Sequence, residues 1–351
     1  MASLKDVAKD ANVSISTVSR VLSEDDTLSV ADSTRERIYE SAEKLNYMSL
    51  TLKKKSYSFH TKKSIGLMIF CSKDYEFEDE YFIKIRRGIE AECARLQINI
   101  SRVIRKGQNI EEETNLNDLN GVIVVGNIPP ETVEQIYSKH NRVVFIDESP
   151  GVEVFDSVTP DLYGATIRLL EHLLLLGHQK IGFIGGQEII HSPSEYTELE
   201  RIDNLEKLRF LPYKKIMAAK GFYNDQHVYL GDWSTDDGYQ LMMKAIQKGQ
   251  LPTAFITASD PLATGALRAL HESGLQVPED ISIVSYNDIE LASYLTPPLT
   301  TAKVFSEEMG NSAVKLLNER MEGREIPTKI IHPCKIQFRE SSAPIKTPVV
   351  H

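Results

Sequence analysis

The chain has 351 residues and a formal net charge of −10, with 41% hydrophobic and 26% charged residues. This globular composition is too long for one small core, so two or three domains are expected. The sequence shows no run of 18 apolar residues, no secretory leader pattern, and no paired or metal-like spacing of its three cysteines. We therefore expect a cytoplasmic protein without a membrane span, disulfide framework or zinc site.

The acidic charge is unevenly distributed along the chain. Residues 1–63 hold 11 lysines and arginines against 9 acidic residues, whereas the remainder holds 29 against 41. Residues 47–63 carry five lysines and no acidic residue. The negative average therefore does not exclude a nucleic-acid partner, and we predict an N-terminal domain over 1–47 followed by a basic linker over 48–63.

Three short helices are predicted in the N-terminal domain. The first has an apolar stripe at helical spacing, formed by Leu4, Val7, Ala8 and Ala11. Asn12 suits a turn with positive φ, after which Ser14 can cap the second helix. Ser29 or Asp32 is the predicted cap of the third helix. The buried residues predicted for the second and third helices are Val18, Val21, Leu22, Ile38, Ala42 and Leu45.

The exposed face of the second helix has residue types that contact DNA. Two helices joined by a tight turn place the start of the second helix in the major groove, where hydroxyls and an arginine meet bases or phosphates. Ile15 is predicted to be exposed although it is apolar, and its side chain could contact a thymine methyl group. The predicted contacts on this helix are Ser14, Ile15, Ser16, Thr17, Ser19 and Arg20. A generic helical hairpin that docks on another protein is the alternative interpretation.

Residues 64–341 alternate short apolar runs with amphipathic stretches, which is typical of parallel strands crossed by helices. Strands are predicted at 65–70, 98–103, 121–125, 143–147, 181–185, 254–257 and 281–286. The clearest helices are predicted at 82–96, 162–176, 234–248 and 261–272, with Gly177 and Gly274 as stop signals. The predicted fold class is α/β with two such lobes, followed by a tail over 342–351 that lacks a heptad pattern.

Polar or aromatic residues stand where four of the predicted strands end. They are Phe70 with Cys71, Asp147, Ser259 with Asp260, and Asn287 with Asp288. Open parallel sheets bind ligands outside the carboxyl ends of their strands, so these residues are ligand-site candidates. Trp233 precedes a helix and can offer an aromatic plane to a sugar ring, although a lone tryptophan is more often a core residue. Helix capping is an equal alternative for Asp260 and Asp288.

The N-terminal sequence resembles a known family of regulators. The matching residues are Leu4-Lys5-Asp6-Val7-Ala8, Asn12-Val13-Ser14, Ser16 through Leu22, Thr34-Arg35 and Leu45-Asn46-Tyr47. This ordered run resembles the headpiece of the LacI/GalR family of bacterial repressors, and the resemblance extends to about residue 341. It implies a helix-turn-helix headpiece, a two-lobed periplasmic-binding-protein-like domain, and a homodimer that binds double-stranded operator DNA. Ser29 and Thr34 join the DNA-contacting residues on this basis.

For the ligand, the resemblance implies a small sugar effector, with galactose or a β-galactoside as the leading choice. The implied effector contacts are Phe70, Cys71, Asp147, Arg209, Trp233, Ser259, Asp260 and Asn287. Arg209 matches an arginine that family members place ahead of a helix. Ser259 replaces an asparagine and Ser306 an aromatic residue of lactose-repressor-like members, so the individual sugar is not transferred. Phe70 and Cys71 make their side of the site more apolar.

The linker departs from the family pattern. Related repressors follow the Leu-Asn-Tyr run with a segment whose leucine wedges into the minor groove, and residues 48–56 lack that leucine in place. The lysines at 53–55 (Lys53, Lys54 and Lys55) can instead hold the DNA backbone, and Leu52 can replace the missing side chain. A merely solvated lysine run is the alternative.

No enzyme motif is found. The sequence lacks HExxH, GxSxG, Walker A and CxxC spacings, and the run 177–186 has no GxGxxG, so His178 in it is expected to be structural. We therefore predict a non-enzymatic, cofactor-free repressor of a sugar-utilisation operon that its sugar releases from DNA. The alternatives are a regulator that uses the sugar as corepressor and a sugar receptor without DNA function.

Overall fold

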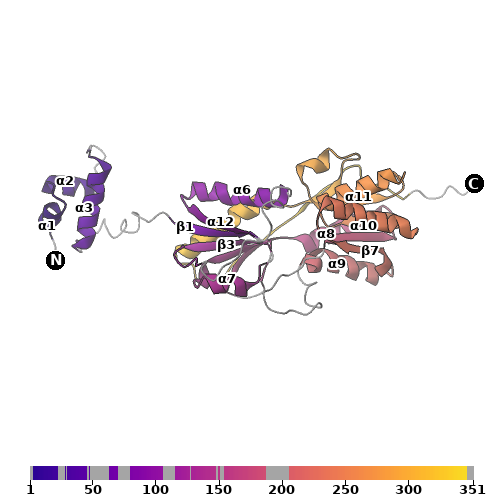
Figure 1. Cartoon of the computed structure of the whole chain (residues 1–351), viewed down its shortest axis with the longest axis horizontal. Coiled ribbons are helices and arrows are strands. Elements are labelled where there is room, and N and C mark those ends of the chain that lie inside the picture. The colour runs from indigo at the N-terminus through magenta and orange to yellow at the C-terminus, as the bar shows by residue number, and fades with distance from the viewer. Residues whose placement is uncertain are drawn as a thin grey trace, which may run out of the picture. The chain divides into compact units, whose positions relative to one another are not determined.

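The computed structural model describes residues 3–22, 28, 30–45, 47, 63–69, 80–105, 115–126, 128–147, 149–150, 154–186 and 205–345. The chain divides into two units, Met1–Lys63, called here the headpiece, and Ser64–His351, called here the core unit (Figure 1). In the described ranges, all strands belong to the core unit. None of the described helices is long and apolar enough to cross a membrane.

The headpiece is built from α1 (Leu4–Asp10), α2 (Ile15–Leu22) and α3 (Asp32–Lys44). Its core consists of Val7, Ala8, Ala11, Val18, Val21, Leu22, Ile38 and Ala42. The predicted turn is confirmed, since Asn12 has a φ of 53°, and Ser14 caps α2 by accepting a hydrogen bond from the backbone N–H of Thr17 at 3.0 Å. The predicted cap of α3 is wrong for Asp32, because the helix begins at Asp32 itself. Ser29 lies outside the described residues.

The first lobe of the core unit is a parallel sheet with the order β11-β5-β4-β3-β1-β2. Its strands are β1 (Ser64–Ile69), β2 (Asn99–Arg105), β3 (Gly121–Val125), β4 (Val143–Ile146), β5 (Asp156–Pro160) and β11 (Lys329–His332). Its helices are α6 (Glu80–Arg95), α7 (Pro130–Ile136), η1 (His140–Arg142) and α12 (Ser306–Met321). Because strand residues alternate between faces, Ile123 and Val125 pack in the cluster with α6 and α12, whereas Val122 and Val124 pack with α7.

The second lobe repeats this plan with the order β12-β10-β9-β8-β6-β7, in which β12 alone is antiparallel to its neighbour. Its strands are β6 (Ile181–Gly186), β7 (Val228–Gly231), β8 (Ala254–Thr257), β9 (Ser282–Asn287), β10 (Thr300–Lys303) and β12 (Lys335–Gln337). Its helices are α8 (Leu162–Leu175), α9 (Leu205–Ala219), η2 (Asp225–His227), α10 (Thr235–Lys248), α11 (Asp260–Glu272) and η3 (Glu290–Ser293). Helices α8 and α9 pack together, and α10 packs on α11 (Figure 1).

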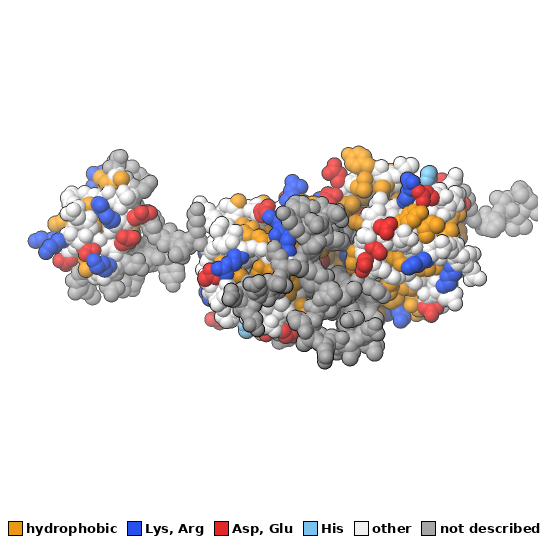
Figure 2. Space-filling view, viewed as in Figure 1, with side chains coloured by type: hydrophobic (Ala, Val, Ile, Leu, Met, Phe, Trp, Pro, Cys, Tyr) orange, Lys and Arg blue, Asp and Glu red, His pale blue; other side chains and the backbone are white. Residues whose placement is uncertain are grey.

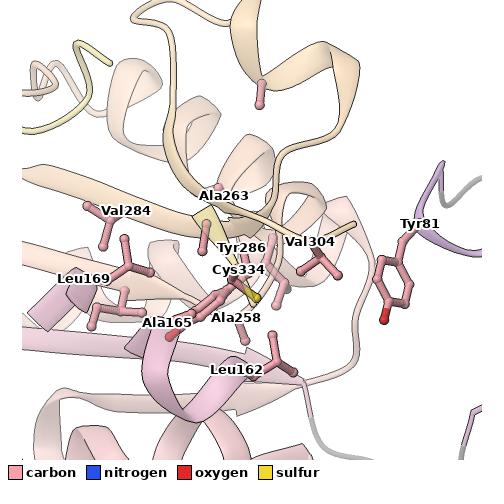
Figure 3. Close-up of a cluster of buried hydrophobic side chains, with 14 of the residues drawn as sticks. Tyr81, Leu162, Ala165, Leu169, Ala258, Ala263, Val284, Tyr286, Val304 and Cys334 are labelled. Atoms are coloured by element: carbon pink, nitrogen blue, oxygen red, sulfur yellow. The ribbon is translucent and has the colours of Figure 1, made fainter. Parts of the chain in front are cut away.

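Within the described residues the chain passes between the lobes at three places, from β5 to α8, from β10 to α12 and from β11 to β12. Each passage leaves the carboxyl end of a strand, so the carboxyl edges of both sheets border the space between the lobes. One buried cluster continues from lobe to lobe, and Figure 3 shows Tyr81 of the first lobe facing Leu162, Val304 and Cys334 of this cluster. This border is the place where a doubly wound fold binds its ligand.

The predicted strands and the clearest predicted helices are present, with ends within two residues of those predicted. Gly177 and Gly274 follow their helices with φ values of 92° and 76°, as expected for stop signals. No range was predicted for α7, α9 and α12 or for the short strands β5, β7, β10, β11 and β12. In α12, Gly310 weakens the helical signal, but a Cβ there would lie 2.2 Å from the Ile85 carbonyl oxygen of α6. The glycine therefore permits the close approach of these two helices.

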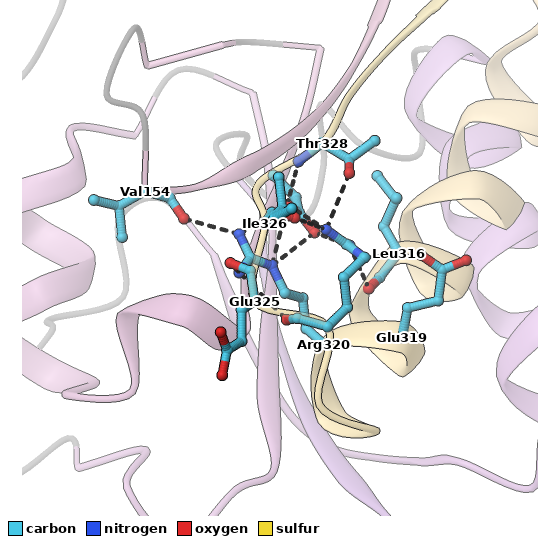
Figure 4. A network of polar contacts seen from close by, with 9 residues as sticks. Val154, Leu316, Glu319, Arg320, Glu325, Ile326 and Thr328 are labelled. Carbon is cyan, nitrogen blue, oxygen red and sulfur yellow. Dashed lines mark hydrogen bonds and ion pairs between the residues drawn. The ribbon is translucent and has the colours of Figure 1, made fainter.

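A buried ion network joins α12 to β5 (Figure 4). The Asp156 carboxylate has no exposed side-chain area and accepts hydrogen bonds from Arg320 at 3.0 Å, from the Thr328 backbone N–H at 2.8 Å, and from Arg324. The Arg320 side chain is 1% exposed and also donates to the carbonyl oxygens of Val154 and Glu325. These bonds hold the end of α12 and the following segment against the start of β5, where β11 adds to the sheet.

We expect Asp156→Ala to lower the free energy of unfolding by about 3–5 kcal/mol, because it leaves two arginines near a buried position without their carboxylate. The matched control is Glu90→Ala, which breaks the partly exposed Arg86–Glu90 pair of α6 and should cost less than about 1 kcal/mol. Urea unfolding of the full-length protein followed by circular dichroism measures both. Equal losses in the two variants would contradict a structural role of the network.

Candidate functional site

Arg209 lies within α9 of the second lobe, with a side chain that is only 5% exposed. Its guanidinium carbon lies 5.4 Å from the centre of the Trp233 ring and 5.5 Å from that of Tyr286, a cation–π arrangement. The Trp233 ring comes from the segment between β7 and α10 and covers Gly186 at the end of β6, where a Cβ would lie 2.3 Å from the ring. An arginine, a tryptophan and the end of β9 are thereby brought together.

Several polar atoms of this group are buried and have no hydrogen-bond partner among the described residues. They are Nε and Nη1 of Arg209, Nε1 of Trp233 and Oδ1 of Asn287. Asn287 is the last residue of β9, is 8% exposed and has a φ of 107°. Leaving a buried polar atom unpaired costs about 1–3 kcal/mol, so each of these atoms calls for a hydrogen-bonding partner. Three donors and one acceptor match a ligand rich in hydroxyl groups.

The first lobe contributes a carboxylate. Asp147 follows β4 with a φ of 76°, is 4% exposed, and accepts a hydrogen bond from the Tyr81 hydroxyl of α6 at 2.5 Å. Burial raises the pKa of Asp147, whereas the hydrogen bond from Tyr81 and the positive charge of Arg209 lower it. Arg209 belongs to the second lobe, so its charge acts on a carboxyl of the first lobe.

Two residues predicted from the sequence to contact the ligand make hydrogen bonds within the protein. The Ser259 hydroxyl caps α11 by accepting from the Leu262 backbone N–H at 3.4 Å. Asp260 is fully buried, and its two oxygens accept from the Thr301 hydroxyl at 2.7 Å and the Ile289 backbone N–H at 2.9 Å. These bonds tie α11 to β10 and to the segment after β9. We therefore leave Asp260 out of the ligand contacts proposed below.

Other expectations need correction or lie outside the described residues. Arg209 is inside α9, not ahead of it, because the helix already begins at Leu205. Asp288 does not cap a helix, since the cap of η3 is Ile289, and its carboxylate pairs with Arg339 at 2.7 Å. Phe70 and Cys71 lie outside the described residues. His178 is structural as expected: its ring nitrogens contact the Thr253 hydroxyl at 2.9 Å and the Ala343 carbonyl oxygen at 3.0 Å.

Tyr81 is the site residue that the sequence did not reveal. Tyr81 lies 66 residues before Asp147 in an amphipathic helix. Packing in the core is enough to explain an aromatic residue on the buried side of such a helix. The position of Tyr81 at the start of a helix that follows a strand was the available signal, because such positions lie at the carboxyl edge of the sheet.

In the headpiece, the predicted DNA-contacting residues lie on one helix and its cap. Ile15 is 46% exposed, and Ser16, Ser19 and Arg20 are exposed as well. The Ser14 hydroxyl lies 2.7 Å from the hydroxyls of both Ser16 and Thr17. Thr34 is partly exposed in the first turn of α3. The remaining calls, Ser29, Leu52, Lys53, Lys54 and Lys55, lie outside the described residues.

Charge on the core unit is mixed on the face that Figure 2 shows. There, basic and acidic side chains alternate over the described elements of both lobes without gathering into one basic area. A duplex is held by many phosphate contacts, which need clustered lysines and arginines. The described residues on this face therefore do not form the clustered basic area that a duplex contact needs.

Comparisons with known proteins agree with both parts of this geometry. Residues 3–49 match the family model "Bacterial regulatory proteins, lacI family", and residues 170–342 match that of a periplasmic binding protein-like domain. The transcriptional repressor MelR of Bacillus subtilis is 41% identical over 343 residues, which is 97% of each chain. The chain belongs to the LacI family. The transcriptional regulator GanR from the same organism is 36% identical, and the match covers 95% of this chain and 96% of GanR.

A solved structure extends the similarity to the whole architecture. The lac repressor dimer bound to operator and the anti-inducer ONPF is 26% identical and superposes with a TM-score of 0.70, covering 97% of this chain and 99% of that one. The predicted α/β fold with a helix-turn-helix headpiece and a periplasmic-binding-protein-like domain is thereby confirmed. Like its relatives, this LacI-family chain is a transcriptional regulator and not an enzyme.

The pKa of Asp260 gives a prediction about stability. Burial raises this pKa to about 7, against hydrogen bonds from Thr301 and Ile289 that lower it. A carboxyl with a higher pKa in the folded than in the unfolded state takes up a proton on folding, so its contribution to stability is present at low pH and is lost as pH rises through about 7. Between pH 5 and pH 8 the parent should therefore lose stability, on the order of 2 kcal/mol, relative to Asp260→Asn.

Urea unfolding at both pH values measures this difference. Asp236→Asn, at an exposed position of α10, is the control and should run parallel to the parent. A constant difference between Asp260→Asn and the parent from pH 5 to pH 8 would refute the assigned titration.

Proposed function

We propose that this LacI-family regulator is a homodimeric repressor whose operator affinity is lowered by a sugar bound between the two lobes, with galactose or a galactoside as the leading effector. The observation that carries the proposal is the set of buried polar atoms of Arg209, Trp233 and Asn287 that have no hydrogen-bond partner among the described residues, together with the effect of the Arg209 charge on Asp147. The similarity to a lac repressor bound to both operator and ONPF supports a chain with these two binding functions.

The ligand chemistry follows from the side chains. Arg209 and Trp233 supply N–H donors, whereas Asp147 and the Asn287 carbonyl supply acceptors, so the site suits neutral hydroxyls that donate and accept. The Trp233 ring provides an apolar plane for the C–H face of a sugar ring. A phosphorylated ligand fits less well, because the Asp147 carboxylate would repel it.

The DNA-binding proposal rests on α2. In a two-fold dimer, two recognition helices reach successive major grooves about 34–36 Å apart, which requires a near-palindromic operator. Ile15, Ser16, Thr17, Ser19 and Arg20 are the proposed base and phosphate contacts. The tail lacks a heptad pattern, which favours a dimer over a helix-linked tetramer.

Regulation is proposed to act through the arrangement of the lobes. The lobes touch directly where Glu80 of α6 accepts a hydrogen bond from the Glu290 backbone N–H at 2.7 Å, three residues after Asn287. A sugar that contacts Asp147 and Asn287 together changes this arrangement. A coupling free energy of about 1–3 kcal/mol corresponds to a 5- to 150-fold change in operator affinity.

We expect Arg20→Ala to weaken binding to a duplex selected from a random library by the parent, by about 10-fold or more, because a base contact contributes about 1–3 kcal/mol. Lys44→Ala removes the same charge from the last residue of α3, where it pairs with Asp10, and should change affinity less. Gel shifts at one fixed salt concentration compare the two. Equal losses would assign binding to charge alone and contradict a recognition helix at α2.

We expect Arg209→Met to weaken sugar binding by at least about 10-fold, because hydrogen bonds to a charged donor contribute about 1.5–3 kcal/mol each. A thermal-shift panel of mono- and disaccharides, including galactose and methyl β-galactoside, identifies the effector, and Arg268→Met at an exposed position of α11 is the control. Adding the identified sugar to the gel shift should release the duplex. Tighter duplex binding would make the sugar a corepressor, and a panel without any response would reject the sugar site.

A further inference from the structure

The contact between Tyr81 and Asp147 stands out among the interactions of the core unit. Its donor and acceptor are 5% and 4% exposed and lie 2.5 Å apart. Tyr81 is the second residue of α6, and its ring meets that of Phe82 edge-on at 5.4 Å. Asp147 directly follows β4. The two partners therefore come from separate packed elements of the first lobe, which fixes their relative position.

The surroundings of Asp147 make this hydrogen bond chemically important. Burial is the main cause that raises the pKa of the carboxyl, and the groups that oppose it are the Tyr81 hydroxyl from α6 and the Arg209 guanidinium from α9. Among the described residues, Tyr81 is the hydrogen-bond donor and Arg209 acts through its charge. A hydroxyl that donates to a carboxylate stabilises the ionised form.

We propose that Tyr81 is a positioning residue of the ligand site, whose hydroxyl holds the Asp147 carboxylate ionised and leaves Oδ2 to accept one hydroxyl of the bound sugar. This inference rests on the proposed sugar-binding function. An ionised carboxylate only accepts hydrogen bonds, so the position selects a ligand hydroxyl that donates. Tyr81 thereby sets which sugar position is recognised and extends binding to lower pH.

The competing interpretation is that the bond only fastens α6 to the end of β4. In that case, loss of the hydroxyl lowers stability equally at every pH and leaves the pH profile of sugar binding unchanged. Tyr213 offers a matched control, because it is a buried tyrosine of α9 whose hydroxyl donates to the Ile181 carbonyl oxygen at 2.8 Å and not to a carboxylate.

The test compares the full-length parent with Tyr81→Phe and Tyr213→Phe. Trp233 is the sole tryptophan of the chain and lies in the site, so its fluorescence reports binding of galactose and methyl β-galactoside directly. Binding should fall as pH decreases through the pKa of Asp147. In Tyr81→Phe the midpoint of this fall should move upward by about 1 pH unit, because the ionised form loses a donor. In Tyr213→Phe the midpoint should match the parent.

A second measurement needs no ligand. The pKa of Asp147 is raised in the folded state, and removing the Tyr81 hydroxyl raises it further, so the loss of stability in Tyr81→Phe should grow as pH rises. Melting temperatures between pH 4 and pH 8 should show this growth, and those of Tyr213→Phe should stay at a constant distance from the parent.

The outcomes separate the two levels of the argument. If the parent binds sugar and Tyr81→Phe keeps the parent's midpoint, or if Tyr213→Phe shifts as much, the role of Tyr81 is overturned and the sugar function stands. If the folded parent shows no response to any sugar, the proposed function is overturned and the inference with it.

Discussion

A buried guanidinium without a full set of hydrogen bonds is the constraint on which the core unit depends. Arg209 is 5% exposed, two of its nitrogens have no partner among the described residues, and aromatic rings flank it. Its positive charge lowers the pKa of Asp147, a carboxyl of the other lobe. Charges in a site of low dielectric constant interact strongly, so this attraction acts across the border between the lobes. In the proposed function, a ligand that supplies the missing hydrogen bonds binds at this border.

The sheet edges supply this site with unusual backbone geometry. Asp147 and Asn287 end strands of different lobes with φ values of 76° and 107°, in a region that non-glycine residues rarely adopt. Such conformations persist when the surroundings impose them, and they occur at functional sites. Gly186 shows the complementary requirement, since the Trp233 ring occupies the space of a side chain there. Among the described residues, Asp147, Asn287 and Asp288 have this geometry at strand ends that border the two lobes, whereas Asn12 and Gln97 have it elsewhere.

Much of this arrangement could be predicted from the sequence, for physical reasons that differ by residue. The spacing of apolar residues predicts the core strands and the four main helices. Turn and capping chemistry predicts the roles of Asn12 and Ser14. Asp147 and Asn287 were expected from their place at strand ends, Trp233 from its place before a helix, and all three from the family resemblance. The Tyr81–Asp147 contact could not be predicted, because it joins residues 66 apart through packing of α6. Asp260 was equally ambiguous, since a buried carboxylate and a ligand-binding one have the same sequence signal.

The first turn of α6 connects the site to the lobe contact. Glu80 and Tyr81 are adjacent, yet one accepts from the Glu290 backbone of the second lobe and the other donates to Asp147. Glu290 lies three residues after Asn287. The residue before it, Ile289, donates its backbone N–H to the Asp260 carboxylate. Residues 80–81 lie in one turn of α6, which therefore contacts both Asp147 of its own lobe and residue 290 of the other lobe. The proposed ligand contact at Asp147 and the contact between the lobes thus depend on adjacent residues of the same turn, so substitutions at Glu80 or Tyr81 are expected to affect ligand binding and the lobe contact together.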